Sequence, residues 1–197
     1  KILPLCIDKR EDMRNEISSF VIADPTKCVG CITCELACFT VHNSKNETRY
    51  TVGTVKTPVI PRLFLVKDED FAMPVQCRHC EDAPCANSCP VNAIKKADNA
   101  IVVDEKLCIG CKTCILACPF GALELLPEYN EAQEVQQYGL EEPKKIAYKC
   151  DLCSKMDGYA CIEACPKDAL SLVEPALDKK TKNLKAALSI LETMKNL

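Results

Sequence analysis

The cysteines of this chain fall into four groups of four, and this arrangement constrains the fold more than any other feature of the sequence. The chain has 197 residues and 17 cysteines, of which only Cys6 stands outside a group. The first and third groups share the spacing C-x2-C-x2-C-x3-C, whereas the second and fourth have a wider central gap. The groups are Cys28, Cys31, Cys34 and Cys38; Cys77, Cys80, Cys85 and Cys89; Cys108, Cys111, Cys114 and Cys118; and Cys150, Cys153, Cys161 and Cys165.

Disulfides and metal sites are the two kinds of chemistry that use cysteine this densely. A disulfide scaffold suits a small secreted domain, but no secretory signal is visible and the cysteine count is odd. The spacings are also tighter and more regular than those of a disulfide framework. The first residue is Lys1 and not methionine, which leaves a removed leader open. We therefore expect a reduced, cytoplasmic chain without a transmembrane segment, since no apolar run approaches the length of a membrane span.

The sequence around the groups repeats as well. The segment "DPTKCVGCITC" (24–34) aligns with "DEKLCIGCKTC" (104–114), and three groups end in the similar sequences "CPVNAI", "CPFGAL" and "CPKDAL". Repetition at this resolution predicts one structural unit that is used several times.

The spacing suits a cage of thiolates around a compact inorganic core. In the bacterial ferredoxin pattern C-x2-C-x2-C-x3-C-P, the first three cysteines bind one [4Fe–4S] cluster and the fourth binds a second cluster. Gly30 and Gly110 allow the backbone to approach such a cluster closely. Zinc also binds four cysteines, but its sites usually combine two separated C-x2-C pairs. The spacing therefore favours iron–sulfur clusters and leaves zinc as the alternative.

Short runs of β-forming residues flank the cysteine groups. The segments "SSFVIAD", "PRLFLVKD" and "KIAYK" predict strands, and "AIKKADNAIVVDE" predicts a hairpin between the second and third groups. Helical turns follow the tight cysteine loops, as in "TCELACF" and "TCILACP". Phe39 replaces the proline that follows the last cysteine of the other groups, and we expect it to change the local turn but not the ligation.

The four motifs resemble the four-cluster, ferredoxin-like electron-transfer subunits of molybdopterin oxidoreductases. The segments "IADPTKCVGCITCELAC", "CRHCEDAPCANSCP" and "KCDLC…CIEACP" are most similar to the small iron–sulfur subunits of formate hydrogenlyase and hydrogen-dependent carbon dioxide reductase. The resemblance, over residues 20–173, implies that the first motif shares its clusters with the fourth and the second with the third. The implied ligand sets for four [4Fe–4S] clusters, bound through iron, are Cys28, Cys31, Cys34 and Cys165 (set A); Cys150, Cys153, Cys161 and Cys38 (set B); Cys77, Cys80, Cys85 and Cys118 (set C); and Cys108, Cys111, Cys114 and Cys89 (set D).

This pairing implies an α+β fold of two bacterial-ferredoxin-like modules, each for two [4Fe–4S] clusters, that are interleaved in the sequence and followed by a C-terminal amphipathic helix. The implied divisions are an N-terminal extension at 1–17, the module of motifs one and four at 18–75 and 146–173, the module of motifs two and three at 76–126, an exposed insertion at 127–145, and the C-terminal helix at 174–197.

The resemblance implies an electron-transfer subunit that is not itself catalytic. We expect it to connect a formate dehydrogenase-type subunit, which carries a molybdenum or tungsten pterin, with a hydrogenase or similar redox partner, and to work in some complexes beside a second iron–sulfur subunit. The alternative is the same relay in another molybdopterin oxidoreductase, a reductase of sulfur or nitrogen compounds with a quinone-linked membrane partner. The formal charge of −3 gives no reason to expect nucleic acid.

The sequence contains no recognisable catalytic constellation. Its only histidines are His42 and His79, and neither belongs to a recognisable nucleophile–base pair. We expect both to face solvent or to lie just behind the ligands, where His79 could donate a hydrogen bond to a cluster sulfur.

Residues 175–197 contain no cysteine and have the pattern of an amphipathic helix. A leucine stripe recurs at helical spacing on one face, and Pro175 suits a first helical turn. The stripe consists of Leu177, Leu184, Leu188 and Leu191. Such a helix packs on its own core, on a membrane surface or on another subunit. Because the cluster modules offer little spare apolar surface, we favour subunit contact and oligomerisation through residues 176–197.

Overall fold

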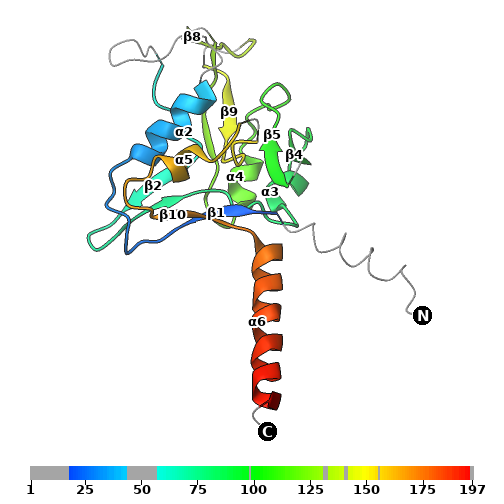
Figure 1. Ribbon diagram of the computed structural model, residues 1–197. Helices are drawn as coiled ribbons and strands as arrows, with labels where there is room; N and C mark the ends of the chain where they lie inside the picture. Colours follow the sequence, from blue (N-terminus) through cyan, green and yellow to red (C-terminus); the bar gives the residue numbers. More distant parts are fainter. Residues whose placement is uncertain are drawn as a thin grey trace, which may run out of the picture.

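The computed structural model combines short strands and short helices in one body, from which a single long helix projects (Figure 1). The structure describes residues 18–43, 57–97, 99–130, 133–139, 142–154 and 156–195. The expected N-terminal extension, including Cys6, lies outside the described residues. The mixed helix and strand content agrees with the expected α+β class.

Each cysteine motif is entered from one strand and left through another. The strands before and after the four motifs are β1 (Phe20–Ala23) and β2 (Phe64–Lys67), β3 (Ala72–Val75) and β4 (Ile94–Ala97), β5 (Ala100–Val103) and β6 (Glu124–Pro127), and β9 (Lys145–Tyr148) and β10 (Leu170–Val173). The strand that leaves one motif pairs antiparallel with the strand that enters the next, as β2–β3, β4–β5 and β6–β9. The last strand, β10, then pairs with β1, so that Phe20 lies opposite Val173. The chain therefore closes on its own beginning.

The insertion at 127–145 is not wholly irregular. Within it, β7 (Tyr129–Asn130) and β8 (Gln133–Glu134) form a small antiparallel ladder, and Gln136 bridges to Pro143. This excursion separates β6 from its partner β9 without interrupting their ladder.

A helix follows or closes each motif, and the helices pack in two pairs. The helices are α2 (Thr33–Asn43), α3 (Pro84–Asn87), α4 (Thr113–Ala117) and α5 (Ala160–Glu163). Helix α2 contacts α5, and α3 contacts α4. Helix α2 is the longest of the four because Phe39 stands where the other motifs have the proline that breaks a helix. The absence of proline therefore lengthens a helix, and the added turn carries His42.

Two small hydrophobic cores correspond to the two helix pairs. One core gathers residues around the first and fourth motifs, and it contains Val21, Ala23, Cys34, Cys38, Leu63, Cys161 and Leu170. The other gathers residues around the second and third motifs, and it contains Ala83, Cys85, Ile94, Ile101, Cys114, Leu123 and Ala147. Cysteines make up a large part of each core. Packing and any group bound by these cysteines are therefore coupled.

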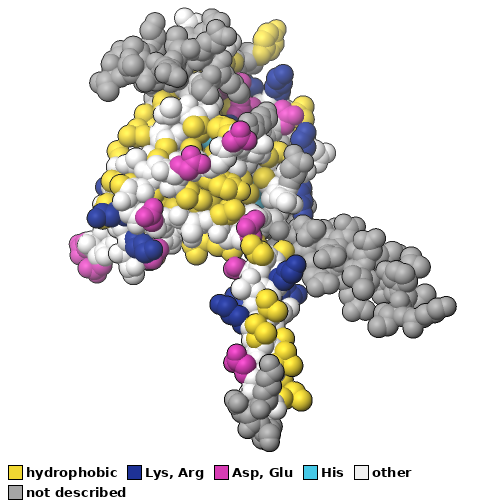
Figure 2. Space-filling view, viewed as in Figure 1, with side chains coloured by type: hydrophobic (Ala, Val, Ile, Leu, Met, Phe, Trp, Pro, Cys, Tyr) yellow, Lys and Arg dark blue, Asp and Glu magenta, His cyan; other side chains and the backbone are white. Residues whose placement is uncertain are grey.

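The long helix α6 (Pro175–Lys195) stands clear of the body (Figure 1), and hydrophobic side chains lie along its surface (Figure 2). It begins at Pro175, where the sequence predicts the first turn of a helix. Between 49% and 60% of the surface of each stripe leucine is exposed. None of the helices in the described part of the chain combines the length and the apolarity that a membrane span requires.

Gly110 allows a close approach between the third motif and β9. Its φ is +70°, and a Cβ at this position would lie 2.6 Å from the carbonyl oxygen of Lys145. Gly121 also has a positive φ, +61°, but a Cβ there would meet nothing within 4 Å. The two glycines thus share a backbone conformation and differ in the space around them.

We therefore expect Gly110→Ala to destabilise the chain more than Gly121→Ala. Both substitutions cost about 1–2 kcal/mol for a left-handed backbone conformation, and only the first adds a clash with backbone, for a total of about 2–5 kcal/mol. Thermal unfolding of the two variants under anaerobic conditions makes the comparison. Equal losses would contradict a steric requirement at Gly110.

Candidate iron–sulfur sites

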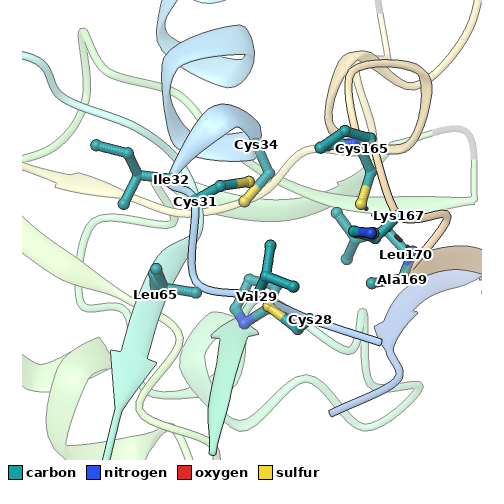
Figure 3. Close-up of a pocket in the computed structure, with 12 residues that line it drawn as sticks. Cys28, Val29, Cys31, Ile32, Cys34, Leu65, Cys165, Lys167, Ala169 and Leu170 are labelled. Carbon is teal, nitrogen blue, oxygen red and sulfur yellow. Dashed lines mark hydrogen bonds between the residues drawn. The ribbon is translucent and has the colours of Figure 1, made fainter. Parts of the chain in front are cut away.

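The first motif opens onto a recess that is completed by a cysteine from the far end of the chain (Figure 3). Its thiols are Cys28, Cys31, Cys34 and Cys165, the four cysteines of set A. The aliphatic side chains of the recess include Val29, Ile32, Leu65 and Leu170. The β1–β10 ladder brings the fourth motif beside the first and so accounts for the presence of Cys165.

Two further recesses repeat this pattern in the other half of the body. One is lined by Cys77, Cys80, Cys85 and Cys118, the cysteines of set C. The other is lined by Cys89, Cys108, Cys111 and Cys114, the cysteines of set D. The three recesses enclose similar empty volumes of about 360, 310 and 320 Å³, counting solvent at their mouths. The three recesses therefore repeat one arrangement, in which four thiols lie among aliphatic side chains.

The remaining cysteines, those of set B, lie deeper in the protein. Cys38, Cys153 and Cys161 are buried, and Cys150 is partly buried. Burial raises the pKa of the Cys161 thiol to about 12, and the neighbouring Cys38 and Cys153 raise it further in the same direction. Burial likewise raises the pKa of Cys150 far above its usual range. Because iron binds the thiolate, these buried thiols would release their protons on binding metal.

Backbone N–H groups donate hydrogen bonds to several of these sulfurs. Two of these bonds lie in the repeated segments that follow the last cysteine of a motif. In the fourth residue of "CPVN" and "CPKD", Asn92 and Asp168 have φ values of 50° and 47°. This left-handed turn, which Asn and Asp tolerate better than most residues, directs the next N–H back to the cysteine. Ala93 N and Ala169 N lie 3.3 Å from Cys89 Sγ and Cys165 Sγ. The sequence analysis recognised the repeated exit but not its role as a donor of N–H···S bonds.

The threonine that repeats in the first and third motifs contacts an exposed cysteine in each. Thr33 Oγ1 lies 3.3 Å from Cys31 Sγ, and Thr113 Oγ1 lies 3.4 Å from Cys111 Sγ. The hydroxyl bond is the main reason that the pKa of Cys31 is lowered, and the same holds for Cys111. The alignment of "CVGCITC" with "CIGCKTC" could have identified this threonine as functional, because it is the same in both motifs whereas the residue before it differs.

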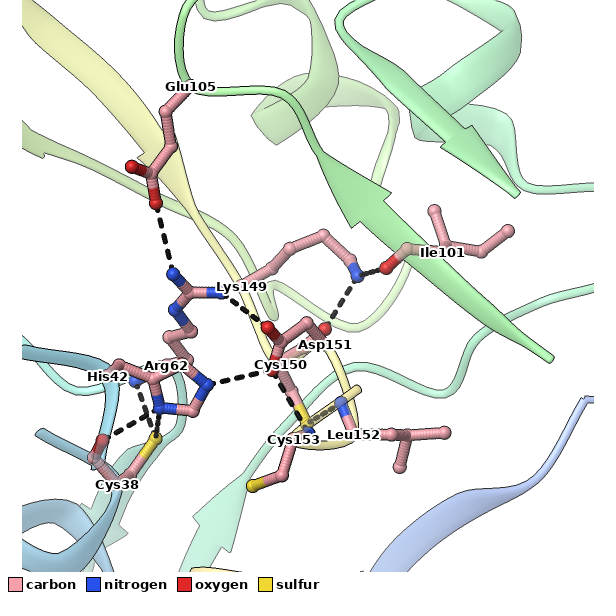
Figure 4. Close-up of polar contacts among 10 residues, drawn as sticks. All are labelled: Cys38, His42, Arg62, Ile101, Glu105, Lys149, Cys150, Asp151, Leu152 and Cys153. Atoms are coloured by element: carbon pink, nitrogen blue, oxygen red, sulfur yellow. Dashed lines mark hydrogen bonds and ion pairs between the residues drawn. The ribbon is translucent and has the colours of Figure 1, made fainter. Parts of the chain in front are cut away.

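His42 lies just behind a ligand of set B and not in open solvent, which is one of the two positions that the sequence predicts for it. Its Nε2 lies 2.8 Å from Asp151 Oδ1, and its Nδ1 lies 2.8 Å from the Cys38 carbonyl oxygen and 3.6 Å from Cys38 Sγ (Figure 4). Burial alone lowers the pKa of His42, but its hydrogen bonds to Asp151 and Cys38 raise it to about 9. Arg62 also binds Asp151, at 2.7 Å, and reaches Glu105 at 3.0 Å. These charged groups surround set B and connect it with the segment before the third motif.

His79 is buried, with 1% of its surface exposed, and it stands between Cys77 and Cys80, which agrees with the expected position just behind the ligands. Burial, followed by the charge of Lys149, lowers the pKa of His79 to about 3, so the ring is neutral near pH 7. The N–H of Ile101 donates to Nδ1 at 2.9 Å, which places the ring proton on Nε2. Among the described residues, this buried Nε2 has no partner. A hydrogen bond from His79 to a cluster sulfur remains a prediction.

The donor sets fit iron–sulfur clusters better than single metal ions. Four thiols line each recess, yet among the described residues no three Cys, His, Asp or Glu side chains converge closely enough to hold one ion. A zinc ion needs its sulfur ligands about 2.3 Å from one point, whereas a larger inorganic core accepts wider spacing. All-thiol sets are also the usual ligands of [4Fe–4S] clusters, which supply one-electron transfer when bound.

Comparison with known proteins agrees with this chemistry. Two family models, both described as a 4Fe–4S dicluster domain, match residues 76–122 and 100–166. The chain is 42% identical to the putative electron transport protein YsaA of Escherichia coli over 159 residues, which cover 80% of this chain and 91% of that protein. The chain belongs to the 4Fe–4S dicluster electron-transfer proteins.

Two other relatives support the same placement. The electron transport protein HydN of Escherichia coli is 40% identical over 80% of this chain and 89% of its own length. Formate hydrogenlyase subunit 2 of the same species is 39% identical over 80% of this chain and 83% of its own length. Because these relatives are named for electron transport, the chain has an electron-transfer role and not a catalytic one.

We expect the Thr33 hydroxyl, which bonds Cys31 Sγ, to tune the cluster that Cys31 binds. Thr33→Val removes a hydrogen bond that favours the more negative, reduced form, so the potential of that cluster should fall by about 40 mV if the bond is worth about 1 kcal/mol. Redox titration followed by electron paramagnetic resonance measures this shift. Thr40→Val is the matched control, because the Thr40 hydroxyl binds the Leu36 carbonyl and no sulfur; an equal shift there would contradict the assignment.

Proposed function

We propose that the chain holds four [4Fe–4S] clusters through sets A to D and relays electrons between two larger redox subunits. The observation that carries the proposal is the grouping of thiols in the recesses, which follows the sets that the sequence resemblance implies. Sixteen cysteines are the number that four such clusters require. We also propose a cytoplasmic location, because free thiolate ligands suit a reducing compartment.

The proposed partners are a formate dehydrogenase-type subunit with a molybdenum or tungsten pterin and a hydrogenase or similar protein. Support comes from relatives named formate hydrogenlyase subunit 2 and hydrogenase-4 component A, the latter 41% identical over 80% of this chain. A second similar iron–sulfur subunit would extend the relay.

Exposure of the motifs supports electron exchange at sets A and D. Cys31 and Cys111 are the exposed cysteines among the described residues. Each lies beside an exposed aliphatic side chain, Val29 at 60% and Ile109 at 56%. An apolar rim around a ligand near the surface suits contact with a redox partner. Sets B and C, which are more buried, would then connect the two exposed sets.

Metal analysis of the native complex, isolated anaerobically through a tag on this chain, tests the proposal. We expect 16 iron atoms per chain, four for each of four clusters, no stoichiometric zinc, and co-purifying tungsten or molybdenum. Cys31→Ser and Cys165→Ser should each disturb the same cluster signal, because both residues belong to set A. Zinc in place of iron would contradict the cluster assignment, and iron without tungsten or molybdenum would contradict the pterin partner.

We further propose that α6 packs on another subunit and supports oligomerisation. Support comes from the exposed leucine stripe on a helix that stands clear of the body (Figure 2). A helix with one apolar face is normally stabilised by packing that face against a partner.

Deletion of residues 176–197 should therefore reduce the size of the assembly in solution while leaving the iron content unchanged. Leu188→Ser should have the same effect, whereas Lys182→Ser, away from the leucine stripe, should not. Analytical ultracentrifugation of the three variants measures the size. An unchanged mass after the deletion would refute the contact.

A further inference from the structure

Lys149 is a buried cation at the junction between the two halves of the body. Only 2% of its surface is exposed, which places it among the largest fully buried side chains of the described residues. Its Nζ donates hydrogen bonds to the carbonyl oxygens of Ile101 and Cys150, the latter at 2.6 Å (Figure 4). The two acceptors belong to different halves, since Ile101 lies on β5 and Cys150 opens the fourth motif.

Ile101 organises this junction because β5 pairs only with β4 within the described residues. The other edge of β5 therefore needs partners for its backbone groups. The Ile101 carbonyl accepts from Lys149, and the Ile101 N–H donates to His79 Nδ1. One strand residue thus connects the second motif, through His79, with the fourth motif, through Lys149.

A buried ammonium group is costly unless a negative charge lies near it. Both hydrogen-bond acceptors of Lys149 are neutral carbonyls, and no carboxylate forms an ion pair with it in the described part of the chain. The nearby groups that would become anionic are the cysteines of two sets. Burial raises the pKa of Cys85, of set C, and the charge of Lys149 is the strongest influence that opposes it. The charge of Lys149 also acts to lower the pKa of Cys80, of set C, and of Cys150, of set B.

We propose that the ammonium group of Lys149 is a fixed positive charge between sets B and C that raises the reduction potentials of the clusters these sets hold. The inference rests on the proposed four-cluster function and adds to it a residue that binds no cluster itself. A cluster becomes more negative by one charge when it accepts an electron, so a nearby cation stabilises the reduced form. For a separation of about 10 Å and an effective dielectric constant of about 20, Coulomb's law gives a change of roughly tenfold in the reduction equilibrium.

Substitution of Lys149 by neutral and charged residues in the full chain tests this role. Lys149→Gln removes the charge and keeps a hydrogen-bond donor, Lys149→Met removes both, and Lys149→Arg keeps the charge. Lys95→Met is the matched control, because it removes the same charge from an exposed side chain of the neighbouring strand β4. Redox titration of the four cluster signals by electron paramagnetic resonance is the measurement. Signals are assigned by serine substitution of one cysteine in each set.

We expect two of the four potentials, those of sets B and C, to fall in Lys149→Gln and Lys149→Met, each by about tenfold in the equilibrium constant, or about 59 mV. Lys149→Arg and Lys95→Met should leave all four in place. Unchanged potentials in an iron-replete neutral variant would overturn the proposal, as would an equal fall in Lys149→Arg. If the neutral variants lose iron while Lys149→Arg retains it, the charge is needed to hold the clusters, which supports the proposal. Loss in all three variants would overturn it in favour of a purely structural role.

Failure of this inference can be distinguished from failure of the proposed function. The iron content of the unmodified chain tests whether four clusters are present, and Lys149 does not enter that result. If the chain binds about 16 iron atoms and its cluster potentials do not change when Lys149 is substituted, the proposed function stands and only the role of Lys149 is refuted.

Discussion

The ladder between β1 and β10 is the interaction on which the arrangement of the thiols depends. Without it, the first motif offers Cys28, Cys31 and Cys34 to its recess but lacks Cys165, which comes from near the other end of the chain. The remaining ladders then place each motif beside the next in the same manner. The strands of the described residues are short and form two-stranded ladders, so no ladder is stable by itself and each depends on the packing around it.

The small cores explain why the chain needs more than side-chain burial. Aromatic residues make up only 5% of the sequence and tryptophan is absent, so few large side chains are available for packing. Cysteines fill part of both cores, among them Cys34 and Cys161 in one and Cys85 and Cys114 in the other. A bound cluster would therefore act as a cross-link within the core, and its binding free energy would also be folding free energy.

Features that depend on local sequence could be predicted, and features that depend on distant partners could not. The strands at "SSFVIAD" and "KIAYK" and the 94–103 hairpin were predicted correctly, because alternating β-forming residues act locally. The bond between His42 and Asp151 could not be predicted, because the two residues lie more than a hundred positions apart in the sequence. Lys149 gave no signal at all, since a lysine before a cysteine motif looks like any surface lysine until Ile101 is placed beside it.

The distribution of donors and charges differs between the exposed and the buried sets, and electrostatics gives the reason. Four clusters with a net charge of about −2 each would add about −8 to the formal −3 of the chain. At Cys31 and Cys111, which are exposed, solvent screens this charge, and a threonine hydroxyl adds one directed bond. The cysteines of sets B and C are less exposed to solvent, so a single hydroxyl there would offset little of the negative charge of the bound clusters. A buried cation acts there at low effective dielectric, where each charge counts for more, and Lys149 occupies the place between them where one cation can serve both.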